Sequence, residues 1–170
     1  MTLTDDAAPL PDTIRPALAS ALAAKGYSRL TPVQVEMASG GHGEADLLVS
    51  AQTGSGKTVA FGIAVAPTLL GGAGEFGPAG RPLGLVVAPT RELAIQVRRE
   101  LDWLYAAARI QTATCVGGMD MRSERRALER GAHLVVGTPG RLRDHITKGA
   151  LDLGALRAVV LDEADEMLDL

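Results

Sequence analysis

The stretch Leu47-Leu-Val-Ser-Ala-Gln-Thr-Gly-Ser-Gly-Lys-Thr58 decides the fold class of this chain. A short apolar run typical of a buried strand leads into a glycine-rich turn, and an apolar helix is predicted to follow over Lys57–Leu70. The two glycines allow the backbone to turn its N–H groups inward, and the helix N-terminus adds a positive end. The stretch therefore predicts a phosphate-binding loop, with Ala51 in place of the usual first glycine.

This loop supplies most of the candidate nucleotide-binding residues. We expect Lys57 to reach the β and γ phosphates of a nucleotide as a point charge, and the Thr58 hydroxyl to ligate Mg²⁺. The residues expected to hold the nucleotide here are Ala51, Gln52, Thr53, Gly54, Ser55, Gly56, Lys57 and Thr58. The alternative is a glycine turn with an exposed lysine, which the strand expected before the loop and the helix expected after it disfavour.

Apolar runs and amphipathic stretches alternate along the whole chain. Strands are predicted over Leu47–Ser50, Leu83–Ala88, Thr112–Val116, Leu134–Val136 and Ala158–Leu161. Helices are predicted over Asp12–Gly26, Lys57–Leu70, Arg91–Ala108, Met119–Arg130 and Arg141–Lys148. We therefore expect an α/β fold, a parallel sheet covered by helices on both faces, with ligands at the carboxyl ends of the strands.

Composition agrees with one globular domain. The 170 residues are 46% hydrophobic and 22% charged, and no apolar run approaches the ~20 residues of a membrane span. The N-terminus has no basic region of the kind found in signal peptides, so we expect a cytoplasmic chain, with residues 1–11 as a flexible lead-in. The net charge of −3 means that any nucleic-acid binding must be confined to a local patch.

Several polar residues are expected to be structural. Cys115 is the only cysteine, which excludes an internal disulfide and a multi-cysteine zinc site, and its apolar surroundings predict a buried thiol. The three histidines lack the spacing of metal ligands, and we expect them at the surface or at strand edges: His42, His133 and His145. The run from Arg122 to Arg130 mixes charges at helical spacing, which predicts a solvated face.

A second anchor for phosphate chemistry is the run Val159-Val-Leu-Asp162-Glu163, an apolar strand ending in two carboxylates. Asp162 is placed to hold Mg²⁺, partly through water, and Glu163 to polarise an attacking water as general base. The pair favours an ATPase over a GTPase or a small kinase. The alternative is a pair of acids that stabilise a helix N-terminus.

With Asp162-Glu-Ala-Asp165 in place, the chain resembles the first RecA-like domain of the DEAD-box ATP-dependent RNA helicases. Four further motifs follow the family order: Gly26-Tyr27 with Thr31-Pro-Val-Gln34, Pro89-Thr-Arg-Glu-Leu-Ala94, Gly117-Gly118 and Thr138-Pro-Gly-Arg141. The resemblance covers residues 12–170 and implies a RecA-like domain that binds ATP and Mg²⁺. It also implies that Gln34 makes a bidentate contact to adenine, that Tyr27 packs near the base, and that Asp165 couples hydrolysis to RNA binding.

RNA is the partner that the resemblance implies. The residues expected to contact it are Pro89, Thr90, Arg91, Gly117, Gly118, Thr138, Pro139, Gly140 and Arg141. They follow predicted strand ends, where small residues expose N–H groups and hydroxyls to a phosphate chain, although Arg91 and Arg141 have Glu92 and Asp144 as alternative partners. Aromatic residues make up only 3%, so we expect sequence-independent backbone and 2′-hydroxyl contacts rather than base stacking.

The sequence ends at Leu170, shortly after the acidic motif. The resemblance implies a later strand between residues 47–50 and Ala158–Leu161, and a second RecA-like domain carrying arginine fingers. We therefore expect an incomplete domain with a slot between those strands, unstable and nearly inactive by itself. It would be the ATP- and RNA-binding half of a helicase that unwinds or remodels RNA duplexes. The alternatives are a non-catalytic nucleotide- or RNA-binding fragment and a DNA helicase module of the P-loop class.

Overall fold

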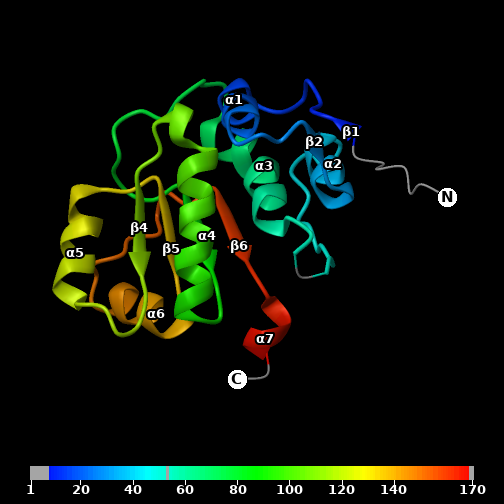
Figure 1. Ribbon diagram of the computed structural model, residues 1–170. Helices are drawn as coiled ribbons and strands as arrows, with labels where there is room; N and C mark the ends of the chain where they lie inside the picture. Colours follow the sequence, from blue (N-terminus) through cyan, green and yellow to red (C-terminus); the bar gives the residue numbers. More distant parts are fainter. Residues whose placement is uncertain (1–7, 53, 169–170) are drawn as a thin grey trace.

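A four-stranded parallel sheet forms the centre of the molecule in the computed structural model, which describes residues 8–52 and 54–168 (Figure 1). Its strands are β3 (Gly84–Val87), β4 (Thr112–Cys115), β5 (Leu134–Gly137) and β6 (Ala158–Leu161), in the order β4-β5-β3-β6. Leu85 of β3 stands opposite both Val135 and Val159, so the parallel register is continuous across the three strands. The predicted α/β class and parallel sheet are confirmed.

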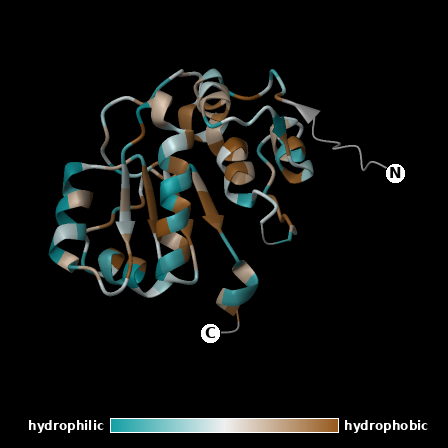
Figure 2. Ribbon diagram, viewed as in Figure 1, coloured by the Kyte–Doolittle hydropathy of each residue, from teal (hydrophilic) through white to brown (hydrophobic). Residues whose placement is uncertain are grey.

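Helices cover both faces of this sheet. The helices of the described chain are α1 (Pro16–Ala24), α2 (Pro32–Ala38), α3 (Lys57–Leu70), α4 (Arg91–Leu104), α5 (Met121–Arg130), α6 (Pro139–Thr147) and α7 (Ala164–Leu168), with a 3₁₀ turn η1 (Ala106–Ala108) after α4. Helices α1, α3 and α4 pack on one face against Val86 and Val136, whereas α5 and α6 pack on the other against Leu85 and Val135. Because successive strand side chains point to opposite faces, each apolar run serves both cores. Figure 2 shows the strands β5 and β6 as mostly hydrophobic and α5 as mostly hydrophilic.

Proline explains the main difference in helix bounds. The helix predicted from Asp12 begins at Pro16, and residues 12 and 13 form a turn instead. A proline four residues into a helix has no N–H for the intrahelical bond, and it holds the preceding residue in extended conformation, as at Arg15 with φ −53° and ψ 135°. At the first helical position its fixed φ is favourable. Gly26, with φ 83°, follows the end of α1 as predicted.

Two other helices start at different residues from those predicted, one at a capping side chain and one at a proline. Helix α5 begins at Met121 because the Asp120 carboxylate accepts hydrogen bonds from the N–H groups of Arg122 and Ser123. Helix α6 begins two residues before the predicted start, at Pro139. The predicted helix over Arg91–Ala108 is divided into α4 and the 3₁₀ turn η1.

The strand predicted over Leu47–Ser50 is not formed, and that prediction is wrong for the described chain. Residues 45–50 are exposed and outside any strand, with Leu48 99% exposed. A buried parallel strand needs neighbours that pair its backbone and layers that cover its faces. Within residues 8–52 and 54–168 the sheet ends at β6, where Val159 and Leu161 are 55% and 59% exposed.

The start of the described chain is attached to the domain. Ala8–Pro9 forms β1, which pairs antiparallel with β2 (Arg29–Leu30), whereas residues 1–7 of the expected lead-in lie outside the described residues. Among the described residues no helix is long and apolar enough to cross a membrane.

Candidate functional site

The glycine-rich loop turns as its sequence predicts. Gly54 and Gly56 have φ of 81° and 80°, the left-handed region that glycine adopts without a steric penalty, and Gly56 caps the N-terminus of α3. The Ser55 hydroxyl is buried and has no hydrogen-bond partner among the described residues. A buried hydroxyl without a partner is costly, so the loop is suited to a polar ligand. Thr53 lies outside the described residues.

The segment before α2 is hydrogen-bonded to this loop. Gln34 is 1% exposed, and its side chain closes a capping box by accepting a hydrogen bond from the Thr31 N–H at 3.0 Å. Its Nε2 donates to the Gly56 carbonyl at 3.2 Å, and the Thr31 hydroxyl donates to the Ser55 carbonyl at 2.8 Å. The residue predicted to read the base is therefore in contact with the residues predicted to hold the phosphates.

The two carboxylates after β6 lie on the other side of the loop. Asp162 is 7% exposed and its N–H donates to the Val87 carbonyl at 2.9 Å, which fixes it at the carboxyl end of the sheet. The Lys57 ammonium donates to Glu163 Oε1 at 2.8 Å and forms an ion pair with it. The loop and the acidic pair therefore form one site in which the cation of Lys57 is already paired.

The surroundings raise the pKa of both Asp162 and Lys57, for different reasons. Burial raises the pKa of Asp162, and the neighbouring Glu163 carboxylate adds to the rise. The hydrogen bond that Lys57 donates to Glu163 raises the pKa of Lys57, so the ammonium stays protonated at neutral pH. Asp165 is exposed in the first turn of α7 and adds to the negative potential at Lys57.

The oxygen donors that the sequence assigns to Mg²⁺ are of the right kind. Thr58 lies half-buried in the first turn of α3, and one carboxylate oxygen of Asp162 accepts a hydrogen bond from the Glu163 N–H at 3.1 Å. Hydroxyl and carboxylate oxygens are the ligands that Mg²⁺ prefers, and the ion commonly keeps several waters. The donor set therefore fits this ion.

The predicted RNA-contacting residues lie at the same edge of the sheet, after β3, β4 and β5. Thr90 caps α4 by accepting from the Leu93 N–H at 3.2 Å. The Arg91 guanidinium reaches the loop after β4, where its Nη2 lies 3.7 Å from the Met119 sulfur. Its Nη1 packs against Gly118, and a Cβ added at Gly118 would lie only 2.6 Å from that nitrogen. The residues left exposed or half-buried are Pro89, Thr90, Arg91, Gly117, Gly118, Thr138, Pro139, Gly140 and Arg141.

The comparison with known proteins agrees with this arrangement. The model of the DEAD/DEAH box helicase family matches residues 31–170. This chain belongs to the DEAD/DEAH box helicase family. The match includes the glycine-rich loop, the acidic pair and the three loops just described, so the family assignment rests on the same residues as the geometry.

Relatives of this helicase-family chain occur in bacteria, plants and fungi. DEAD-box ATP-dependent RNA helicase CshA of Geobacillus kaustophilus is 43% identical over 147 residues, 85% of this chain and 30% of the relative. DEAD-box ATP-dependent RNA helicase 9 of Oryza sativa is 40% identical over 91% of this chain and 24% of the relative. ATP-dependent rRNA helicase RRP3 of Phaeosphaeria nodorum is 41% identical over 92% and 28%. The chain thus spans less than a third of the length of each of these relatives.

Two predictions of surface position are wrong in this DEAD-box chain, those for Glu124 and His145. Arg141 has an intramolecular carboxylate partner, the alternative to a phosphate contact, and this partner is Glu124, at 3.1 Å. Glu124 was expected on a solvated face but is 4% exposed, and His145, expected at the surface or a strand edge, is 1% exposed. Helix α5 turns Glu124 inward because it shares a face with Ala127 and Leu128, which pack against the second core. This i, i+3, i+4 spacing was the signal available in the sequence.

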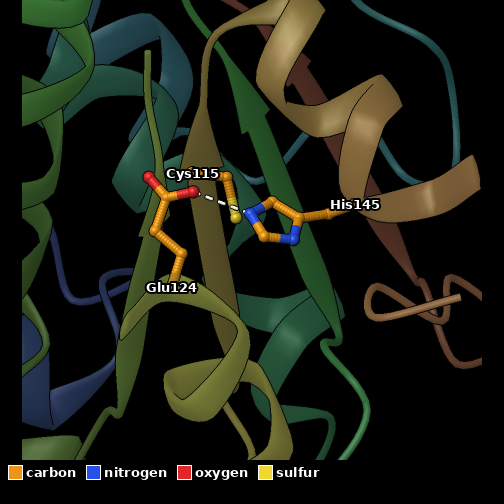
Figure 3. Close-up of side chains that lie close together, drawn as sticks. All are labelled: Cys115, Glu124 and His145. Carbon is orange, nitrogen blue, oxygen red and sulfur yellow. Dashed lines mark hydrogen bonds and ion pairs between the residues drawn. The ribbon is translucent and has the colours of Figure 1, made fainter. Parts of the chain in front are cut away.

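The buried cysteine lies beside these residues. Figure 3 shows the Cys115 side chain next to the paired Glu124 and His145, and the thiol is buried as predicted. Burial and the Glu124 carboxylate raise the pKa of Cys115 to about 12, so the thiol is protonated. His133 is also buried and accepts a hydrogen bond from the Gln111 N–H, whereas His42 lies beside Glu36.

Tyr27 packs against an aromatic side chain of α4. Its ring stacks on Trp103 of α4, with the centroids 5.7 Å apart, and Lys25 lies over the Trp103 ring. This packing attaches the segment after α1 to α4. A contact between Tyr27 and a bound base stays a prediction.

Proposed function

We propose that this chain is the ATP- and RNA-binding half of an ATP-dependent RNA helicase that couples ATP hydrolysis to RNA unwinding or remodelling. The observation that carries the proposal is the 2.8 Å ion pair between Lys57 and Glu163, because it joins the phosphate loop to the acidic pair. Gln34, bonded to the same loop, places the base-reading group beside the phosphate-binding group.

Each nucleotide-site residue has a separate role in this proposal. Lys57 leaves Glu163 for the β and γ phosphates, and Glu163 then accepts a proton from the attacking water. Thr58 and Asp162 hold Mg²⁺, which neutralises charge on the phosphate oxygens when bound. The buried Ser55 hydroxyl gains the polar partner that it lacks among the described residues.

Gln34 retains the groups needed to read adenine. A primary amide has two N–H donors and an oxygen with two lone pairs, and the contacts to Thr31 and Gly56 use one of each. The remaining N–H and lone pair match N7 and the N6 amino group of adenine.

RNA is proposed to run along the loops that follow β3, β4 and β5. Their small residues, such as Gly117 and Gly118, are exposed and leave backbone N–H groups accessible to phosphates. The low aromatic content supports recognition without base stacking. Asp165, which contributes to the potential at Lys57, is the proposed link between the two sites.

We further propose that residues 12–170 form only part of a RecA-like domain and act with a second such domain. The free edge of β6, with Val159 and Leu161 exposed, and the exposed run at residues 47–50 support a strand inserted between them. An unpaired apolar edge of this kind promotes aggregation. By itself, the chain is expected to be unstable and to hydrolyse ATP negligibly, because the arginine fingers belong to the second domain.

Nucleotide selectivity tests the site assignment. In the whole protein, ATP should bind more tightly than GTP, because the Gln34 amide oxygen accepts from the N6 amino group of adenine but would face the acceptor O6 of guanine. Gln34→Ala should remove that preference. Lys57→Ala should weaken binding of both nucleotides. Equal affinities of the unaltered protein for ATP and GTP would contradict the assignment of Gln34.

A further inference from the structure

A buried charged cluster lies outside the nucleotide site, between α5 and α6. It consists of Glu124, Arg141 and His145, whose side chains are 3%, 14% and 1% exposed. A buried carboxylate is stable only when paired and hydrogen-bonded, so its partners show what it holds together. Figure 3 shows Glu124 and His145 directed at each other from their two helices.

Both oxygens of the Glu124 carboxylate are used. Oε1 accepts from the Val116 N–H at 2.8 Å, immediately before Gly117 and Gly118. Oε2 accepts from Arg141 Nη1 at 3.1 Å and lies 2.7 Å from His145 Nε2. One carboxylate therefore connects the end of β4 to both the first turn of α6, through Arg141, and its last turn, through His145.

Arg141 completes a ring of contacts around the glycine pair. The same Nη1 that donates to Glu124 also donates to the Met119 carbonyl at 3.1 Å. Gly117 and Gly118 are thus held on one side through the Val116 N–H and on the other through the Met119 carbonyl, and both bonds lead to Glu124. Two glycines have little conformational preference of their own, so the fixed ends must set their arrangement.

We propose that Glu124 is a positioning residue for RNA binding, and that Arg141 acts with it by fixing the Gly117–Gly118 turn instead of contacting a phosphate. This inference rests on the proposed RNA-binding function. The Arg141 guanidinium is held by a buried carboxylate and a carbonyl, whereas Arg91 is exposed and has no carboxylate partner within residues 8–52 and 54–168. Arg91 is therefore the phosphate-contacting arginine of this edge.

The cluster is not proposed as a metal site, although Cys115, Glu124 and His145 offer ligand atoms within 4.8 Å of one another. The Glu124 oxygens already have three hydrogen-bond partners, and the Arg141 guanidinium supplies the positive charge that a cation would bring. A metal would have to displace that arginine.

Glu124→Gln removes one contact of the carboxylate and allows the other two to remain. The amide oxygen can still accept from the Val116 N–H, and the amide N–H₂ can donate to the other tautomer of His145, but it cannot accept from Arg141. We expect RNA affinity of the whole protein to fall at least about tenfold, the effect of losing a hydrogen bond to a charged group, with ATP affinity unchanged within about twofold. Glu129→Gln is the matched control, because this exposed residue of the same helix removes the same charge.

The salt dependence of RNA affinity separates positioning from phosphate contact. RNA affinity falls as salt rises, so a plot of log affinity against log salt has a negative slope. Removing one phosphate contact to a single strand makes this slope less steep by about 0.7. We expect the less steep slope for Arg91→Gln, whereas Arg141→Gln should weaken RNA binding and leave the slope unchanged. The double variant Glu124→Gln/Arg141→Gln should bind RNA no worse than the weaker single variant, because both residues act through one contact.

Three results would overturn the inference. The first is a salt slope that becomes less steep in Arg141→Gln as it does in Arg91→Gln, and the second is an RNA affinity of Glu124→Gln equal to that of Glu129→Gln. The third is a loss of RNA affinity in the double variant equal to the sum of the losses in the single variants. Preserved ATP affinity shows that a variant is folded. If Glu124→Gln loses ATP binding as well, Arg141→Gln and its salt slope decide between the two roles. Failure of the unaltered protein to bind RNA would instead contradict the proposed function.

Discussion

Glu163→Gln should tighten nucleotide binding at the same time as it stops hydrolysis. The Lys57 ammonium is 2.8 Å from Glu163 Oε1, and nucleotide binding must transfer that ammonium to the phosphates. The glutamine oxygen can still accept a hydrogen bond from Lys57, but the charge that competes with the phosphates is gone. The substitution therefore destabilises the protein without nucleotide more than it destabilises the nucleotide complex, and the nucleotide binds more tightly.

The size of this effect follows from exposure and chemistry. The Lys57 and Glu163 side chains are 23% and 24% exposed, so their attraction is partly screened by water. A hydrogen bond to a charged group contributes about 1 kcal/mol more than a neutral one, and 1 kcal/mol corresponds to about a fivefold change in affinity. We therefore expect about fivefold tighter binding of a non-hydrolysable ATP analogue.

The assay is a titration of the whole protein with that analogue and Mg²⁺, measured calorimetrically in the absence of RNA. Glu166→Gln is the control, because this exposed residue of α7 carries the same charge and has no contact with Lys57. Weaker or unchanged binding by Glu163→Gln, or equal tightening by the control, would refute the view that Glu163 competes with the nucleotide for Lys57.

Three further predictions concern backbone, packing and pH. Gly56→Ala should reduce ATP affinity more than Gly54→Ala. Both substitutions place an alanine in the left-handed backbone conformation, at a cost of about 1–2 kcal/mol, but only the Cβ at position 56 would lie 2.2 Å from Gln34 Nε2. Equal losses of ATP affinity would contradict this. Gly62→Ala should lower the free energy of unfolding by about 1–3 kcal/mol, measured by urea denaturation, because its Cβ would come within 2.6 Å of a leucine methyl carbon. Because the pKa of Asp162 is raised, its carboxylate becomes protonated at a higher pH than an ordinary aspartate as the pH falls. Mg²⁺-dependent ATP binding should therefore begin to weaken at that higher pH, and ATP titrations from pH 7 to 4 would show it.

Local signals in the sequence were sufficient for much of the fold. Helix α3 has the predicted bounds because a glycine turn and an apolar run mark its start and its length, and β6 likewise has its predicted bounds. The strand predicted over residues 47–50 failed for the opposite reason. Strand formation there depends on a partner elsewhere in the chain, and no described residue supplies one.

The site shows the same division between local and distant information. Gly54 and Gly56, the two residues expected to let the backbone turn, adopt the left-handed conformation. The contact between Gln34 and Gly56 and the pairing of Glu124 with His145 join residues 22 and 21 positions apart, and they depend on how helices pack. A charge pattern alone placed Glu124 on the surface, because it took no account of the apolar neighbours on the same face.

RNA-stimulated ATP hydrolysis by the whole protein tests the central claim most directly. We predict that RNA raises the rate of ATP hydrolysis, that DNA of the same sequence does so less, and that Glu163→Gln lowers the stimulated rate by ~10² or more because a general base is removed. A rate that RNA does not change, equal stimulation by DNA, or near-normal turnover in Glu163→Gln would contradict the account.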